Sequence, residues 1–224
     1  MTTTRSDWGV ALLRVGVGGV FVAHGLQKLA GFGIPGVAGM LAQIGVRYNL
    51  LLFRSRPESK EEVNEDPLAG EAPAAYVERV ARAKAEFGWR RMMQRNLPQA
   101  PVLAADTTVA IAGRILGKPA SREEAAQMLG ALSGTRHEVL TAVALAQSDW
   151  LESALSVSEV EFKKLSEEEI RQYVATGECD DKAGAYAIQG RAARFVVELR
   201  GSYSGVMGLP LYETSQLLDK LPRR

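Results

Sequence analysis

Strand-like apolar runs alternate with amphipathic helical stretches from Pro73 to the C-terminus, and this alternation constrains the fold more than any other feature. A helix is predicted to begin at Pro73, a favoured first position, and to end at Gly88. Two more helices are predicted after Ser121 and Ser166, because each serine is followed by a glutamate at capping-box spacing. Interleaved strands and helices predict an α/β domain built on a mixed sheet.

The strands are predicted from apolar runs bounded by turn residues. One run, residues 101–106, ends at Asp106, and a second run, residues 107–113, leads into a turn. Further strands are predicted at residues 138–146, 157–162 and 194–199, and the charged, proline-punctuated stretch 54–70 is predicted to be a loop.

Composition narrows the class of protein. A chain of 224 residues fits one domain, or one domain with a short appendage. The net charge of +1 argues against nucleic acid or an acidic membrane surface as the main partner. The lone cysteine, Cys179, cannot form an internal disulfide, and no Cys/His cluster has zinc spacing. These features favour a cytoplasmic protein.

The N-terminal segment differs in amino-acid composition from the rest of the chain. Residues 9–26 are apolar and glycine-rich, with Arg14 as their only fixed charge. About 18 residues is the lower edge of what spans a bilayer, and the glycines and proline at 31–36 then break any helix. The segment is also a poor secretion signal.

Asp106 is the first candidate for chemistry, because it follows an apolar strand where a sheet edge commonly opens on a ligand site. Such a carboxylate can hold magnesium or take a proton from water. On these residues alone, a turn or capping role beside Thr107 and Thr108 is the plainer interpretation.

Three lysines sit beside small or turn residues, at positions 84, 118 and 182. Each ammonium suits phosphate oxygens, although a solvated surface role is the plainer interpretation for any one of them. Gln189, in the small-residue segment 183–192, offers a donor and an acceptor that could read a base edge. Glu65 lies in the charged loop, where solvation is the default interpretation.

Together these segments resemble the Maf family of nucleotide pyrophosphatases. The resemblance rests on AADTTVAIAGRILGKP, LSEEEIRQYVATGE, DKAGAYAIQGRAARFV, GSYSGVMGLPLYET and YVERVARAKA, in the family's order, and covers about residues 40–224. It implies a two-lobed α/β fold like that of inosine triphosphate pyrophosphatases, with a mixed sheet flanked by helices around a nucleotide cleft. It also implies a homodimer and a requirement for Mg²⁺.

The resemblance assigns roles by motif. It implies that Asp106 accepts a proton, that Lys84 and Lys118 hold phosphates, and that Glu65 assists with metal or water. Thr107 and Gln189 occupy positions that set base preference, and their identities resemble the branch that acts on dTTP and UTP. The implied reaction is hydrolysis of a pyrimidine nucleoside triphosphate to monophosphate and pyrophosphate.

The N-terminal segment departs from this family. The stretch LLRVGVGGVFVAHGLQKLAGFGIPGVAGM resembles the N-terminal part of DoxX membrane proteins. We therefore treat residues 1–39 as a DoxX-like segment and residues 40–224 as the Maf-like domain. Either the segment is a genuine extension that associates with membranes, or the two parts belong to mis-joined reading frames. Any membrane association would come through residues 1–39 alone.

The DoxX-like segment stands where the family has a phosphate-binding motif. The family begins with a strand and S-x-S-P-R-R, whose serine and arginines grip the triphosphate, and this chain lacks them. Each lost charge-assisted contact is worth about 1.5–3 kcal/mol. Residues 20–23, VFVA, are expected not to replace the missing strand, because their spacing to Gly45 is longer than in the family. Smaller departures are Asn64, where the family favours an acid, and Cys179, where it favours proline.

Three hypotheses therefore stand. The first is an active pyrophosphatase on dTTP and UTP. The second is a catalytically impaired relative that binds nucleotide or acts as a regulatory protein, motivated by the absent arginines. The third is a membrane-associated protein defined by its N-terminal segment.

Overall fold

The computed structural model describes residues 20–23, 33–51 and 63–222. Most of the apolar N-terminal stretch 9–26, on which the expectation of membrane association rests, lies outside the described residues. Within the described residues, no helix is both long and apolar enough to cross a bilayer.

The described residues form one mixed sheet. Its strands are β1 (Val20–Ala23), β2 (Tyr48–Leu50), β3 (Val102–Ile111), β4 (Arg114–Leu116), β5 (Arg136–Gln147), β6 (Trp150–Phe162) and β7 (Val196–Arg200). The order is β2-β1-β3-β5-β6-β7, with β4 paired to β3. β1 runs parallel to both of its neighbours, and the other pairs are antiparallel. The predicted mixed α/β sheet is confirmed.

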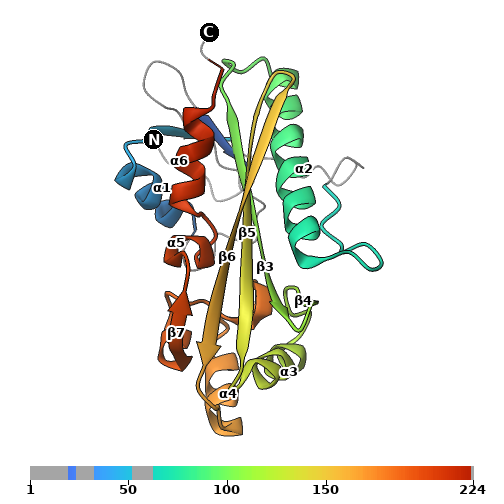
Figure 1. Cartoon of the computed structure of the whole chain (residues 1–224), viewed down its shortest axis with the longest axis vertical. Coiled ribbons are helices and arrows are strands. Elements are labelled where there is room, and N and C mark those ends of the chain that lie inside the picture. Colours follow the sequence, from blue (N-terminus) through green and yellow to red (C-terminus); the bar gives the residue numbers. More distant parts are fainter. Residues whose placement is uncertain (1–19, 24–32, 52–62, 223–224) are drawn as a thin grey trace, which may run out of the picture.

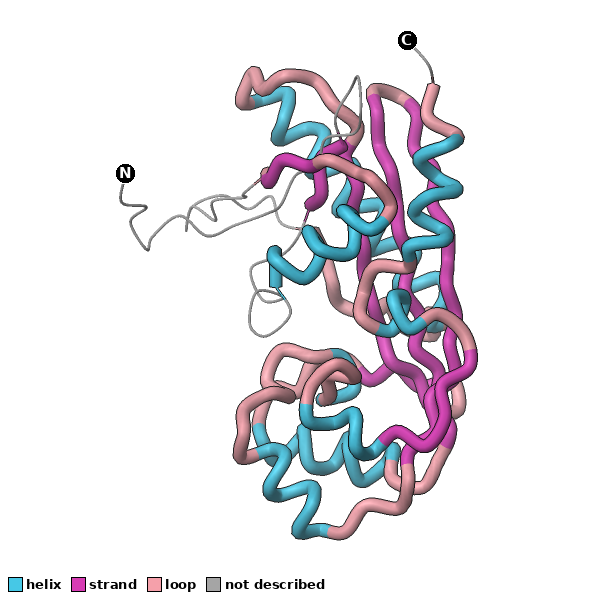
Figure 2. The backbone as a smooth tube through the Cα atoms, turned by 90° about the vertical axis from the view of Figure 1, so that its left-hand side faces the viewer, coloured by secondary structure: helices cyan, strands magenta, loops and turns pink. Residues whose placement is uncertain are grey.

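The helices lie along the long strands in two groups, one beside the upper part of the strands in Figure 1 and one at their lower end. They are α1 (Gly33–Gln43), α2 (Pro73–Gln94), α3 (Arg122–Leu132), α4 (Glu167–Val174), α5 (Tyr203–Val206) and α6 (Leu211–Asp219), with short 3₁₀ turns η2 (Ala183–Ala185) and η3 (Arg191–Phe195). Figure 1 shows α2 on one side of the upper strands, with α1 and α6 on the other. α3 and α4 lie at the lower end, and Figure 2 shows the strands running past both groups.

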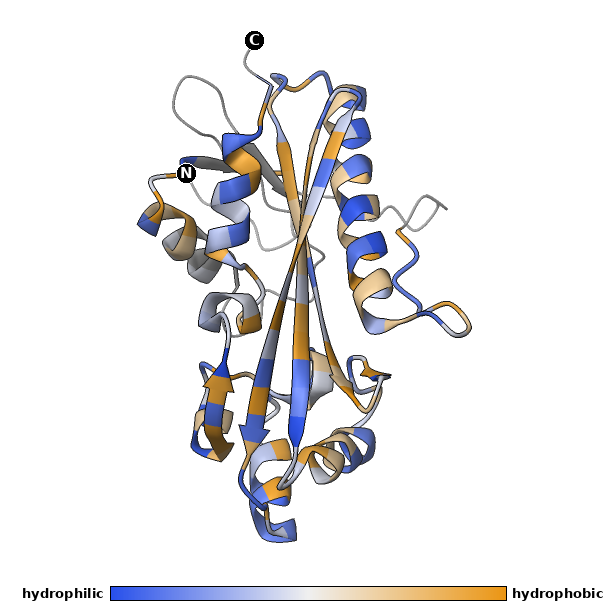
Figure 3. Ribbon diagram, in the orientation of Figure 1, coloured by the Kyte–Doolittle hydropathy of each residue, from blue (hydrophilic) through white to orange (hydrophobic). Residues whose placement is uncertain are grey.

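The core is divided in the same way. In the half with α2, Val77 and Val80 pack against Val102 and Ala104 of β3, and a separate cluster on the opposite face joins α1 and α6 to Leu103. The other half has its own cluster. Strand alternation explains the first two clusters, because successive side chains point to opposite faces. Figure 3 shows polar and apolar residues interspersed along α2, as this one-sided burial requires.

β3 differs from the prediction of two strands meeting at Asp106. The strand is continuous from Val102 to Ile111, so Asp106 lies in its middle rather than at its end. The polar triplet Asp106, Thr107 and Thr108 interrupts the apolar run without interrupting the backbone, because all three residues keep ladder partners on β5. The argument from a strand end is therefore wrong.

α2 also runs further than predicted, past Gly88 to Gln94. A helical glycine costs only about 1 kcal/mol relative to alanine. Gly88 is buried, and Met92, one turn later, is fully buried, so core packing continues along the same face. That packing outweighs the weak stop signal.

The expectation for residues 20–23 is wrong as well. They form β1 between β2 and β3, with Phe21 opposite Val102. The long spacing from β1 to Gly45 is taken up partly by helix α1, which buries Met40 and Leu41 in the cluster it shares with α6. A parallel strand connection needs such a crossover.

The predicted helix caps are largely confirmed. Ser166 and Glu169 form a complete capping box at α4. At α3, Ser121 Oγ accepts from the Glu124 amide at 3.2 Å, but the Glu124 carboxylate accepts from Ala120 N–H instead of closing the box on Ser121.

Candidate active site

Asp106 is a buried acid in the middle of β3. It shares a face with Ala104, so its side chain points towards α2, and it is only 5% exposed. Lys84 of α2 donates from Nζ to Asp106 Oδ1 at 2.8 Å. The carboxylate is therefore held by a charge-assisted hydrogen bond in a site from which water is largely excluded.

Lys84 is the cation at the centre of the site. Burial alone would lower its pKa, but the negative charges of Asp106 and Glu65 outweigh that effect and raise the pKa above its ordinary value. Its Nζ lies 3.0 Å from Glu65 Oε1 as well as 2.8 Å from Asp106 Oδ1. Lys84 is therefore charged at neutral pH, and it joins two carboxylates from separate segments.

Glu65 links Lys84 to a fourth residue, Lys118. It lies in the loop before α2, and its side chain is 42% exposed. Its second oxygen, Oε2, is 4.0 Å from Lys118 Nζ. The structure thus brings together Glu65, Lys84, Asp106 and Lys118, which we call the charged cluster. Two carboxylates and two ammonium groups alternate through it.

Lys118 is placed by the turn that follows β4. The carbonyl of Gly117 accepts from the Gly184 amide at 3.0 Å, which docks the small-residue segment on this turn. Gly184 has a φ of +65°, and an added Cβ would lie 2.8 Å from the Val109 side chain. Glycine is therefore required for this close approach. Lys118 keeps a side chain that is 35% exposed.

Thr107 lies on the opposite face of β3 from Asp106 and is partly exposed within a buried run. Its Oγ1 is 3.0 Å from Thr141 Oγ1, directly across the ladder on β5. Thr141 donates its single hydroxyl proton to the Gly205 carbonyl at 2.8 Å. Thr141 can therefore only accept from Thr107, and Thr107 is left with lone pairs to offer.

Gln189 is exposed, on the turn between η2 and η3. The residues before it, Tyr186 to Ile188, are buried. The contacts that join the charged cluster include neither Gln189 nor Thr107. Four of the site residues predicted from the sequence are thus joined by the ion pairs described above, and Thr107 and Gln189 are not part of those pairs.

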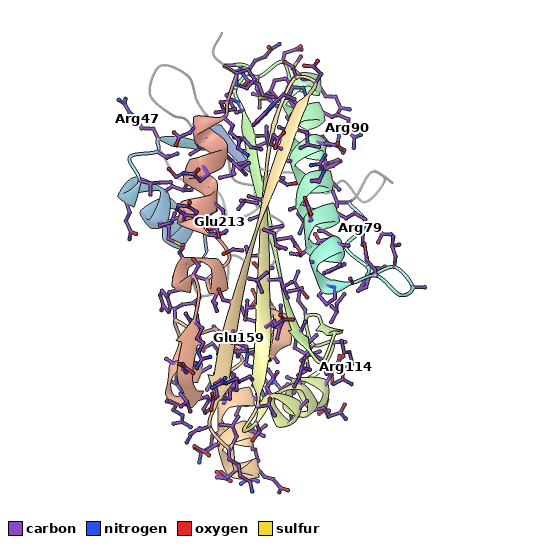
Figure 4. All side chains as sticks on the ribbon, viewed as in Figure 1. Arg47, Arg79, Arg90, Arg114, Glu159 and Glu213 are labelled. Carbon is purple, nitrogen blue, oxygen red and sulfur yellow. The ribbon has the colours of Figure 1, made fainter. Side chains whose placement is uncertain are left out.

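Sequence reasoning missed the residues that hold the Glu65 loop. Tyr76 Oη donates to the Glu65 carbonyl at 2.9 Å, and Arg79 donates to the carbonyls of Asn64 and Asp66 at 3.1 and 3.0 Å. Figure 4 labels Arg79 on α2 where the helix faces this loop. The only sequence signal is the spacing of Tyr76 and Arg79, which puts both on one side of the helix.

The residues that depart from the family pattern have local roles. Asn64 Oδ1 accepts from the Asp66 amide at 2.9 Å and so turns the loop beside Glu65. Cys179 is fully buried, and burial raises the pKa of its thiol to about 11. Neither side chain joins the charged cluster.

The carboxylates also bear on metal binding. Among the described residues there is no group of three or more acids, histidines or cysteines that could hold an ion. Mg²⁺, however, is commonly bound by one or two carboxylates together with water and substrate phosphates. Asp106 and Glu65, on either side of Lys84, fit that kind of site.

Comparison with known proteins places this geometry in context. Residues 38–221 match the family model described as Maf-like protein, and residues 9–53 match the model described as DoxX. Similar proteins include one from Nitrosomonas europaea, 54% identical over 181 residues, which cover 81% of this chain and 87% of that protein. Another, from Aromatoleum aromaticum, is 55% identical over 80% of this chain and 88% of its own. A third, from Dechloromonas aromatica, is 52% identical over 81% and 90%. All three carry the name dTTP/UTP pyrophosphatase.

Proposed function

We propose, on the premise that the chain belongs to the Maf family, that it hydrolyses dTTP and UTP to the monophosphate and pyrophosphate. The observation that carries the proposal is the charged cluster, in which Lys84 holds the Asp106 carboxylate at 2.8 Å within a largely buried site. The names of the similar proteins support the same activity.

Asp106 is the residue that takes the proton. A carboxylate held by Lys84 is already oriented, and its proton-accepting oxygens face the side on which α2 and the Glu65 loop lie. In the proposed reaction a water attacks the α-phosphorus as Asp106 removes its proton, and the bond between the α-phosphorus and the bridging oxygen breaks. The electron pair leaves on pyrophosphate.

Lys84 and Lys118 stabilise the developing charge. The Lys84 ammonium has three donors and gives two of them to Asp106 and Glu65, so one can meet a phosphate oxygen. Lys118 is the more exposed of the two and suits the outer phosphates. Such fixed charges are usually the largest contribution to catalysis of this kind.

Asp106 and Glu65 are the residues that would hold Mg²⁺ together with the nucleotide phosphates. When bound, the ion would neutralise phosphate charge and polarise the attacked phosphoryl group. Lys84 lies between the two carboxylates and pairs with both, at 3.0 Å from Glu65 Oε1 and 2.8 Å from Asp106 Oδ1.

Thr107 and Gln189 are proposed to read the base. Thr107 offers only lone pairs, because its proton is committed to Thr141. A hydroxyl that can only accept favours a ring N–H, which thymine and uracil carry and cytosine lacks. Gln189, on its exposed turn, can supply both a donor and an acceptor.

The second candidate is a relative that binds nucleotide without efficient turnover. It is favoured by the absence of S-x-S-P-R-R from the sequence. Titration calorimetry with dTTP separates the two candidates: tight binding without turnover supports the impaired relative, and absence of binding removes both.

Four further expectations are also proposals. We place the protein in the cytoplasm as a homodimer, with membrane association only through residues 1–39. The boundary between the DoxX-like and Maf-like parts is proposed near residue 40, inside the stretch 38–53 where the two family matches overlap.

The test is to incubate the protein with dTTP, UTP or GTP and Mg²⁺ and to measure pyrophosphate. We expect release from dTTP and UTP to exceed release from GTP and to fall sharply in Asp106→Asn. Release from dTTP that is no faster in the parent than in that variant would show the assignment to be wrong.

A further inference from the structure

The loop that carries Glu65 is bound to α2 by one arginine. Arg79 Nη1 donates to the Asn64 carbonyl at 3.1 Å, and Nη2 donates to the Asp66 carbonyl at 3.0 Å. These two carbonyls belong to the residues on either side of Glu65. The backbone at Glu65 is therefore held from both directions by a side chain of the helix that also supplies Lys84.

The orientation of the guanidinium is itself fixed. Arg79 Nε donates to Glu71 Oε1 at 2.7 Å and Nη2 donates to Glu71 Oε2 at 2.8 Å, a two-point ion pair. Glu71 Oε2 also accepts from the Leu68 amide at 2.9 Å, which ties the far end of the same loop. The Arg79 hydrogen bond, with that of Leu68, lowers the pKa of Glu71 to about 2, so the pair persists through mildly acidic solution.

Tyr76 completes the attachment from one turn earlier on α2. Its hydroxyl donates to the Glu65 carbonyl at 2.9 Å, and its ring lies 5.6 Å from the Arg79 guanidinium carbon. Burial, followed by the charge of Asp106, raises the pKa of Tyr76 to about 12, so the hydroxyl remains a donor. Three consecutive carbonyls, from Asn64 to Asp66, are thus bound to α2.

The donors of Arg79 are too fully used by the loop and Glu71 for the residue to bind a phosphate at two points as well. The Arg79 side chain has five N–H groups. Four contacts, to Asn64, Asp66 and the two oxygens of Glu71, occupy four of them. Arg79 therefore has too few donors left to replace, by a two-point grip on a triphosphate, the arginines that the N-terminal motif would have provided.

We propose that Arg79 is a positioning residue for the reaction, which sets the place of the Glu65 carboxylate between Lys84 and Lys118. The inference rests on the proposed function for its kinetic consequence, although the attachment of the loop is a separate claim. Without Arg79 the loop loses both backbone contacts that flank Glu65, whose side chain is 42% exposed. Displacement of a catalytic group by about 1 Å can cost about a hundredfold in rate.

The experiment compares Arg79→Lys with Arg82→Lys. Lysine keeps the charge of Arg79 but cannot reach two carbonyls and two carboxylate oxygens at once. Arg82 is the matched control, because it lies one turn later on α2 and bonds Ser153 of β6 at 3.0 Å, away from the loop. We expect kcat/KM for dTTP to fall about 10–100-fold in Arg79→Lys and to change less than about threefold in Arg82→Lys.

Two readouts distinguish positioning from general damage. In a Glu65→Gln background, Arg79→Lys should cost no more than about threefold, because its effect passes through the Glu65 carboxylate. Amide hydrogen exchange should accelerate at Asp66 and Leu68 in Arg79→Lys only, while amides of β5 stay protected.

Each outcome has one meaning. Equal kinetic losses with and without the Glu65 carboxylate would overturn the positioning role, as would unchanged exchange at Asp66 and Leu68. If the parent does not hydrolyse dTTP, the proposed function fails. The exchange measurement still decides whether Arg79 holds the loop.

Discussion

On one face of β3, Asp106 meets the ammonium of Lys84 in a buried ion pair. On the other face the Thr107 hydroxyl meets the Thr141 hydroxyl of β5, which in turn donates to the Gly205 carbonyl of α5. Asp106 and Thr107 are adjacent, and strand alternation alone separates them. The first face is suited to moving a proton and stabilising phosphate charge, and the second to reading an uncharged group by the direction of its hydrogen bonds.

The uncharged character of the second face extends along β5. His137 shares that face with Thr141, and its Nε2 lies 2.9 Å from Tyr186 Oη. Burial lowers the pKa of His137 to about 4, so it carries no charge at neutral pH. At these positions β3 and β5 therefore carry a charge on the α2 side and neutral polar groups on the other.

The largest expected effect comes from removing the cation of the charged face. Lys84→Met keeps the length of the side chain but leaves two carboxylates without their shared partner. Breaking a buried ion pair in this way typically costs about 3–5 kcal/mol. We expect a loss of that size in urea unfolding, together with loss of pyrophosphate release. Arg82→Lys is the control, and an unchanged midpoint would contradict the account.

A smaller effect concerns His137 and the neutral face. Because its folded pKa of about 4 lies below the ordinary value of 6.5, its contribution to stability is complete above pH 6.5 and is lost as pH falls towards 4. A pKa difference of this size corresponds to roughly 3 kcal/mol in full, of which about 2 kcal/mol is lost between pH 7 and pH 5. Unfolding at pH 7 and pH 5 should show the loss in the parent and a flatter profile in His137→Gln. Equal slopes would exclude His137 as the cause.

The smallest expected effect tests the direction of the Thr107 hydroxyl. Thr141→Val removes the acceptor of the Thr107 proton, so Thr107 becomes free to donate as well as accept. The ratio of kcat/KM for dTTP over dCTP should then fall about tenfold, or about 1.4 kcal/mol. Thr141→Ser should keep the parent ratio, and an unaltered ratio in Thr141→Val would mean that Thr107 does not read the base through its lone pairs.

The sequence allows much of this architecture to be predicted, but for uneven reasons. The amphipathic face of α2 and the caps of α3 and α4 are local signals, and they survive in the structure. The alternation of strands and helices likewise predicts the mixed sheet. The four members of the charged cluster could be grouped only through resemblance to a family, because they lie on separate segments.

Other features carry no local signal. The polar triplet at Asp106 suggests the end of a strand, since its satisfying partners, Lys84 and Thr141, are distant in the sequence. The Arg79 contacts to the Glu65 loop are invisible in the sequence for a similar reason, because their acceptors are two backbone carbonyls, which every residue possesses. β1 was missed because a spacing argument ignores a helix that fits within the connection.

The measurement that tests the central claim most directly is a side-by-side determination of kcat and KM for dTTP and UTP in Asp106→Asn and Thr107→Val. General-base removal should lower kcat about 10²–10⁴-fold in Asp106→Asn with little change in KM. Thr107→Val should alter KM and the preference among bases while kcat stays within about tenfold. A large fall in kcat for Thr107→Val, with Asp106→Asn close to the parent, would contradict the assignment of chemistry to one face of β3 and recognition to the other.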